Sequence, residues 1–147
     1  MAYLEGWLRV VRGDRPASIV FDHGPIFILV QLREFGPPLV ASPVFAAWFK
    51  EARRAWARAL DLVVWLDAPD TVLLPRIDGR DQRHVVKHKP TATAVEFLGG
   101  YRRGYERLLG EMAEDGQFRL IRFDTSRVGH EAIAEEVLGA IRGGPAA

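Results

Sequence analysis

The stretch DLVVWLDAPDTVLLPRIDGRDQRHVVKHK (residues 61–89) decides how we expect this chain to fold. After its first aspartate come five consecutive apolar residues, 62–66. A continuous apolar run of this length is typical of a parallel strand that is covered on both faces. Residues 69–80 then follow a helical pattern. Pro75 must kink this helix or shift its start, because proline removes a backbone donor from a helix interior.

The same alternation of short strands and helices continues on both sides of this stretch. Residues 18–21 and 118–123 are short β-branched and aromatic runs, which predict two further strands. Helical spacing of apolar residues predicts helices over 2–12, 26–35 and 43–59, a long one through 98–112, and a last one carrying Ile133, Val137 and Ile141. Strands alternating with helices predict an α/β fold: a doubly wound, mostly parallel sheet with helices on both faces.

The bulk composition describes a single domain spanning residues 1–147, of which 48% are apolar. Basic and acidic residues nearly balance, 20 against 19, which argues against a general nucleic-acid-binding protein. The chain has no cysteine, so disulfides and thiolate metal sites are excluded, and we expect a cytoplasmic protein. No apolar run is long enough to cross a bilayer, and the N-terminus has no signal-peptide pattern. We therefore expect no membrane partner.

The first candidate site is the junction Asp22-His23-Gly24-Pro25. Each predicted strand ends in an aspartate, Asp22, Asp67 or Asp124, and ligands of such sheets collect beyond the carboxyl ends of the strands. A carboxylate there can hold a magnesium-bound water or accept a proton, and a helix starting at Pro25 would favour an anion at its N-terminus. The alternative is an ordinary strand-turn-helix junction whose aspartate only caps the helix.

The second candidate site is the basic segment, residues 76–89. It contains two acids, Asp78 and Asp81, and seven potential cations: Arg76, Arg80, Arg83, His84, Lys87, His88 and Lys89. Cations beside a flexible loop can neutralise the charge that develops in phosphoryl transfer. The alternative is a basic face that is simply solvated.

These motifs, in this order, resemble the thymidylate kinase and deoxynucleoside kinase branch of the P-loop kinases. The resemblance covers roughly residues 1–141. The segments that carry it are IVFDHGP (19–25, the acidic strand and turn), LDLVVWLDAPD (60–70, the strand before the LID), RIDGRDQRHVVK (76–87, within a LID of about 76–90), residues 96–109 (the helix returning from the LID) and IRFDTS (121–126, the loop near adenine). The resemblance implies a P-loop-kinase-like fold and a nucleoside or nucleotide kinase-like phosphotransferase, with ATP and Mg²⁺ as cofactors.

The resemblance also implies catalytic roles for four residues. Asp22 would be the base or the carboxylate that holds magnesium through a water molecule. Arg76, Arg80 and Arg83 would be the LID arginines that bind the phosphates during transfer.

Binding roles follow in the same way. His23 lies where relatives often carry Arg or Gln facing the substrate, so the identity of the substrate stays open. Tyr101 is a second candidate for contacting a small-molecule or nucleotide substrate, although we expect both it and Tyr105 to pack in the core. The remaining candidates would bind the nucleotide: Asp124, Thr125, Ser126 and Lys87.

One element of the family is missing from the sequence. Nothing matches GxxxxGK[ST], the phosphate-binding loop, and no Gly-Lys pair occurs. We therefore expect either that the start is internal to a longer gene product or that a degenerate protein has closed up the two flanking strands. As it stands the chain should show little or no phosphotransfer, and whether it is an enzyme stays open. One alternative is a noncatalytic module that pairs with another subunit through an exposed sheet edge or uses only the basic segment to bind anionic partners. Another is a different α/β fold such as a flavodoxin-like domain. The chain could also form a homodimer.

Overall fold

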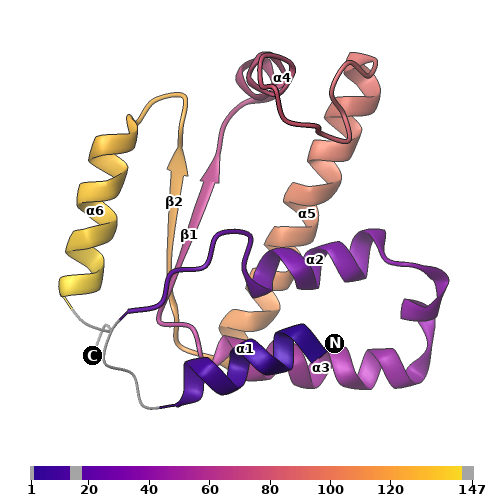
Figure 1. The fold of residues 1–147 in the computed structure, drawn as a ribbon, viewed down its shortest axis with the longest axis vertical. Coiled ribbons are helices and arrows are strands. Elements are labelled where there is room, and N and C mark those ends of the chain that lie inside the picture. Colours follow the sequence, from indigo (N-terminus) through magenta and orange to yellow (C-terminus); the bar gives the residue numbers. More distant parts are fainter. Residues whose placement is uncertain (1, 14–17, 144–147) are drawn as a thin grey trace. The chain divides into compact units, whose positions relative to one another are not determined.

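The computed structural model describes residues 2–13 and 18–143 of the chain (Figure 1). Its elements in chain order are α1 (Ala2–Arg12), α2 (Pro25–Phe35), the 3-10 helix η1 (Pro38–Ala41), α3 (Pro43–Ala57), β1 (Leu62–Asp67), α4 (Asp70–Asp78), α5 (Thr91–Asp115), β2 (Arg119–Asp124) and α6 (His130–Arg142). The predicted helices and the second and third predicted strands are confirmed. α4 continues through Pro75. Among the described residues, none of the helices combines the length and the apolar character needed to cross a bilayer.

The sheet is much smaller than the sequence predicts. Over the described residues it has two strands, with β1 parallel to β2 and a register that runs from Leu62 opposite Arg119 to Asp67 opposite Asp124. Helices make up most of the described chain. The prediction of a doubly wound parallel sheet, and with it a P-loop-kinase-like sheet, is therefore wrong.

The difference begins at the first predicted strand, residues 18–21, which has no regular secondary structure. Val20 is 83% exposed, whereas Phe21 packs inward, edge-on to Trp7 and Trp56 with ring centroids 5.4 and 5.8 Å away. A strand needs a neighbour to take up its backbone hydrogen bonds, and residues 18–21 pair with no strand of the described chain. This short apolar run therefore packs the ring of Phe21 against neighbouring aromatic rings instead of extending the sheet.

The chain divides into two compact units. The first unit comprises Met1–Asp61 and Tyr101–Phe118, and the second comprises Leu62–Gly100 and Arg119–Ala147. α5 passes from the second unit into the first between Gly100 and Tyr101.

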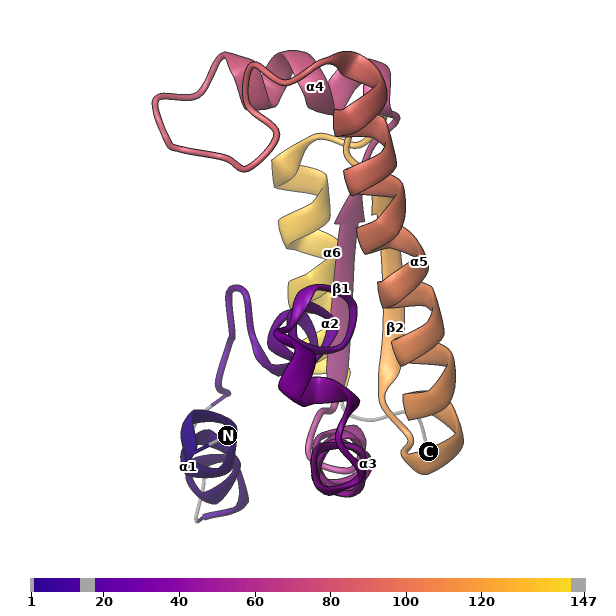
Figure 2. The same cartoon turned by 90° about the vertical axis from the view of Figure 1, so that its right-hand side faces the viewer.

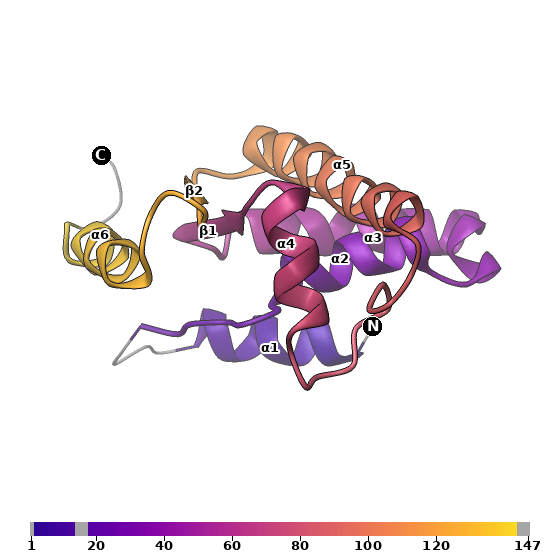
Figure 3. The same ribbon diagram turned by 90° about the horizontal axis from the view of Figure 1, so that it is seen from above.

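The core of the first unit is built from α1, α2, α3 and the later part of α5 (Figure 3). Its most deeply buried large side chains are Leu29, Val30, Trp56, Leu108 and Met112. The aromatic and small residues along one face of α3 are buried in this core or packed against it: Phe45, Trp48, Phe49, Ala52 and Trp56.

Local sequence signals set the starts of α2 and α3. Pro25 occupies the first turn of α2, where its missing N–H costs nothing and its fixed φ suits a helix. Ser42 caps α3, because its hydroxyl accepts a hydrogen bond of 3.2 Å from the backbone N–H of Phe45. Both helix starts could therefore be predicted from the sequence.

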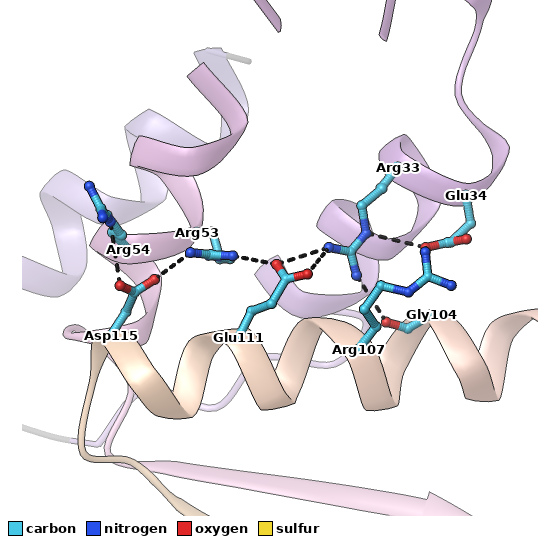
Figure 4. A network of polar contacts seen from close by, with 8 residues as sticks. All are labelled: Arg33, Glu34, Arg53, Arg54, Gly104, Arg107, Glu111 and Asp115. Carbon is cyan, nitrogen blue, oxygen red and sulfur yellow. Dashed lines mark hydrogen bonds and ion pairs between the residues drawn. The ribbon is translucent and has the colours of Figure 1, made fainter. Parts of the chain in front are cut away.

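A ladder of half-buried charges fastens α2 and α3 to α5 (Figure 4). Arg33 of α2 donates two hydrogen bonds of 3.0 Å to the carboxylate of Glu111. Glu111 also accepts from Arg53 of α3, which donates a further bond of 2.8 Å to Asp115. Burial acts to lower the pKa of Arg53, but its hydrogen bonds to Glu111 and Asp115 raise the pKa overall. We call this set the ion-pair ladder; it is extended by Glu34, Arg54 and Arg107.

Gly116 offers a test of how closely α3 approaches the end of α5. A Cβ added at Gly116 would overlap the carbonyl oxygen of Ala57. Gly116→Ala should therefore lower the free energy of unfolding by about 2 kcal/mol, because backbone atoms would have to shift. Urea denaturation measures this change.

Gly110→Ala is the matched control within α5. A Cβ at Gly110 would meet nothing within 4 Å in the described part of the chain apart from its chain neighbours and the backbone of its own helix. This substitution should raise the free energy of unfolding by about 0.5–1 kcal/mol, because alanine favours a helix interior over glycine. Equal stability of the two variants would contradict the packing described here.

Candidate functional site

The carboxyl ends of β1 and β2 meet in the second unit. Asp67 and Asp124 are the last residues of the two strands and lie opposite each other in the register. The backbone N–H of Thr125 donates a hydrogen bond of 2.7 Å to the carbonyl oxygen of Asp67, which ties the loop after β2 to the end of β1. Ligands of parallel sheets bind beyond this edge. It is therefore the starting point for a candidate site.

The carboxylate of Asp124 shapes the loop that follows it. Its Oδ1 accepts hydrogen bonds from the backbone N–H and the hydroxyl of Ser126, and Arg127 lies 3.5 Å from its Oδ2. The hydrogen bonds from Ser126 are the main reason that the pKa of Asp124 is lowered, and the charges of Arg127 and Arg76 lower it further. Asp124 is thus a charged group that fixes the turn at residues 124–127.

Arg76 of α4 connects to this turn. Its guanidinium donates a hydrogen bond of 2.9 Å to the hydroxyl of Thr125 and one of 3.1 Å to the carbonyl oxygen of the same residue. Figure 2 shows α4 beyond the end toward which the β1 arrow points. The structure therefore brings together Arg76 and Thr125, which the sequence assigns to two separate parts of a nucleotide site.

The rest of the basic segment is held in place by a small apolar cluster. Val86 is only 4% exposed and packs with Ile77 of α4 and Ala94 of α5. We call this set the Val86 cluster; its partly buried members are Leu74, Phe97 and Leu98. Sequence reasoning did not find this anchor, and it treated the segment as a flexible loop. The only sequence signal is the Val85-Val86 pair within an otherwise polar run.

Two polar contacts reinforce the backbone of the basic segment. His88 has a left-handed backbone with φ of 59°, and its N–H donates a hydrogen bond of 3.0 Å to the carboxylate of Asp78. The ammonium group of Lys87 donates to the carbonyl oxygen of Arg80. A positive φ is unfavourable for a residue that carries a Cβ. The contact to Asp78 and the nearby burial of Val86 hold His88 in this conformation.

The anchored backbone presents cations to solvent. The exposed basic side chains of the segment are Arg76, Arg80, Arg83, His84, His88 and Lys89. One of the two acids, Asp78, already accepts from His88. Side chains on an ordered backbone lose less conformational freedom on binding than those on a disordered loop. This arrangement suits an anion, and arginine in particular suits a phosphate group.

The predicted catalytic carboxylate, Asp22, lies in the first unit. Its side chain is 98% exposed, and its Oδ1 lies 3.3 Å from Nδ1 of His23. His23 has a φ of 48°, and its ring is edge-on to Phe27 with the centroids 4.9 Å apart. In the part of the chain that the structure describes, no three His, Asp or Glu side chains are grouped as they would be to hold a metal ion. The magnesium role of Asp22 stays a prediction.

Tyr101 belongs to a row of aromatic rings in the first unit. Its ring stacks with Phe27 and Phe35 at centroid distances of 6.2 and 4.4 Å, and its hydroxyl donates a hydrogen bond of 2.7 Å to Gln31. His23 and Tyr101, the two predicted substrate-binding residues, thus both contact Phe27. The expectation that Tyr101 packs against the core is confirmed.

Tyr105 allows a pH test of the same packing. Burial raises the pKa of Tyr105 to about 12, with a smaller contribution from the charge of Tyr101. An unfolded tyrosine loses its proton near pH 10. Between about pH 10 and about 12 the unfolded chain has therefore lost a proton that the folded chain keeps, and the free energy of unfolding should fall as the pH rises.

Urea denaturation across this pH range measures the fall. Tyr105→Phe should remove part of it, because the phenylalanine ring has no proton to lose. If the Tyr105→Phe profile matched that of the unchanged protein, the burial of this hydroxyl would be contradicted.

Comparisons with known proteins give no relative for this chain: no family model and no curated protein matches its sequence, and no solved structure matches its fold. The resemblance to the thymidylate kinase branch therefore depends on the sequence motifs alone. The assignments of Arg80, Arg83, Lys87 and Ser126 to a nucleotide site stay predictions.

Proposed function

We propose that this chain is a binding module for phosphate-bearing small molecules, in particular nucleotides, and that the basic segment provides the phosphate contacts. The observation that carries the proposal is the pair of hydrogen bonds from Arg76 to Thr125. Through them, the segment with the chemistry for phosphate adjoins the loop that resembles an adenine-bordering loop. A nucleotide offers both an anionic group and a planar base, so it suits this pair of segments.

The cations of the segment divide into two roles. Arg76 is engaged with Thr125, so it acts as a positioning residue that links α4 to the turn after β2. Arg80 and Arg83 are exposed and can meet a ligand. Hydrogen bonds between arginine and phosphate oxygens are short and roughly twice as strong as neutral ones. The ligand contacts should therefore be made by Arg80 and Arg83.

The charge of the whole chain favours a small ligand. The formal net charge is only +1, so the positive character is local to the basic segment. A protein that coats nucleic acid usually has a strong basic excess. We propose a cytoplasmic location for this function, because the chain has no cysteine and a reducing compartment suits it.

Isothermal titration with ADP tests the binding site. A variant carrying Arg80→Gln and Arg83→Gln should bind ADP at least about 10-fold more weakly, because each charge-assisted hydrogen bond contributes roughly 1.5–3 kcal/mol. Adenosine should bind more weakly than ADP to the unchanged protein, and the double substitution should affect it little. The matched control is Arg103→Gln, at an exposed arginine of α5 in the first unit, which should leave ADP affinity unchanged.

Val86→Ala completes the same experiment, since it keeps every cation but loosens the Val86 cluster. It should weaken ADP binding through a larger unfavourable entropy of binding. If ADP and adenosine bound equally, or if Arg103→Gln cost as much as the double substitution, the proposed phosphate site would be wrong.

Phosphoryl transfer is the second candidate function, and the contact between Arg76 and Thr125 favours it as well. ATP and Mg²⁺ would then be the cofactors, with the arginines of the basic segment stabilising the charge that develops on the transferred group. The role of base in this reaction is assigned to Asp22 by the resemblance alone, and its exposed carboxylate lies in the first unit. The 147 residues contain no GxxxxGK[ST] loop to hold the phosphates of ATP, so on its own the chain should show little or no turnover.

A phosphate-release assay with ATP, Mg²⁺ and a panel of nucleosides and nucleotides distinguishes the two functions. We expect no release above that of a protein-free blank. Turnover that disappears in Asp22→Asn but persists in Asp81→Asn, an exposed aspartate of the basic segment, would establish the second candidate instead.

A further inference from the structure

The outer face of α1 carries an exposed apolar stripe in addition to the face that is buried in the first unit. Tyr3, Trp7 and Val10 are all exposed, and they recur at i, i+4 and i+7, so they share one side of the helix. Together with Gly6 they line a shallow, largely apolar hollow of about 260 Å³. Large apolar side chains gathered on one exposed face mark an interaction surface.

α6 in the second unit carries a stripe with the same spacing. Ala134, Leu138 and Ile141 are exposed and also recur at i, i+4 and i+7. Although all 13 residues of α6 lie in the described part of the chain, none of them is buried. A helix with several large apolar residues and no buried position has apolar surface left to cover.

The charges beside the two stripes are opposite in sign. Arg9 and Arg12 are exposed in the C-terminal half of α1, and Glu131 and Glu135 are exposed in the N-terminal half of α6. In an antiparallel pair of these helices, the two arginines lie beside the two glutamates. The helix dipoles also favour this orientation, because each positive end lies beside a negative end. Apolar spacing and charge therefore select the same arrangement.

We propose that α1 of one copy of this chain packs antiparallel against α6 of a second copy. A second copy of the chain supplies both the apolar stripe and the charges that complement α1. Two short helices bury an area at the low end of the range for protein interfaces. The dimer should therefore be weak, with a dissociation constant on the order of 10–100 µM. This interface does not depend on ligand binding.

Cysteine cross-linking tests the contact directly, because the chain contains no cysteine of its own. A Val10→Cys variant mixed with an Ala134→Cys variant should form a disulfide-linked dimer at least about 10-fold faster than either variant alone, because the antiparallel interface places these two positions opposite each other and raises the effective concentration of the two thiols. The matched control replaces Val10→Cys with Val44→Cys, at a 78% exposed valine of α3. Equal rates for the two mixtures would overturn the proposal.

A single chain carrying both cysteines distinguishes a contact between two copies from a contact within one molecule. The double variant should yield covalent dimers and higher species. A product that is only oxidised monomer would overturn the proposal.

Charge reversal tests the orientation by sedimentation velocity. Arg9→Glu with Arg12→Glu should weaken self-association by about 10-fold, and so should Glu131→Lys with Glu135→Lys. Mixing the two reversed proteins should restore association, because each then offers the charges that the other needs. Glu114→Lys, at an exposed glutamate of α5, is the control and should change nothing. A mixture that stays monomeric, or an unchanged protein that stays monomeric at several hundred micromolar, would overturn the proposal.

Discussion

The burial of Val86 between α4 and α5 is the constraint on which the candidate site depends. A segment so rich in cations repels itself and has little apolar surface with which to fold. Burying one valine side chain contributes roughly 1.5–3 kcal/mol, enough to hold the backbone around it. At the other end of the segment, Arg76 is tied to Thr125. Apolar packing and a single arginine thus position the segment, while Arg80 and Arg83 stay exposed to solvent.

In the first unit, arginine side chains have a different role from the exposed arginines of the basic segment. In the ion-pair ladder, Arg33 and Arg53 share the carboxylate of Glu111, and Arg53 also reaches Asp115. These charges are partly removed from water and matched by carboxylates, so their role is to fasten three helices together. The exposed arginines of the basic segment are not matched in this way, because acids are scarce there. This difference supports a structural role for the ladder and a binding role for the segment.

The sequence predicted local structure well and long-range pairing poorly. Residues 62–66, Pro25 and the helical spacing over 43–59 are strong local signals, and β1, α2 and α3 appear where these predict. Residues 18–21 carry a similar apolar signal but form no strand, because a strand depends on a partner that local pattern does not reveal. The anchor of the basic segment was hidden for a related reason. Val85 and Val86 look alike in the sequence, yet one is 69% exposed and the other 4%.

A backbone amide NMR titration with ADP tests the central claim most directly. An anchored basic segment that binds phosphate should show the largest shift changes in residues 76–89 and 124–127, and these changes should saturate together with one dissociation constant. The amides near Val86 should already be protected from hydrogen exchange before ligand is added, because the cluster is formed without it. Shift changes confined to other residues, or a segment whose amides exchange as fast as those of an unfolded chain, would contradict this account.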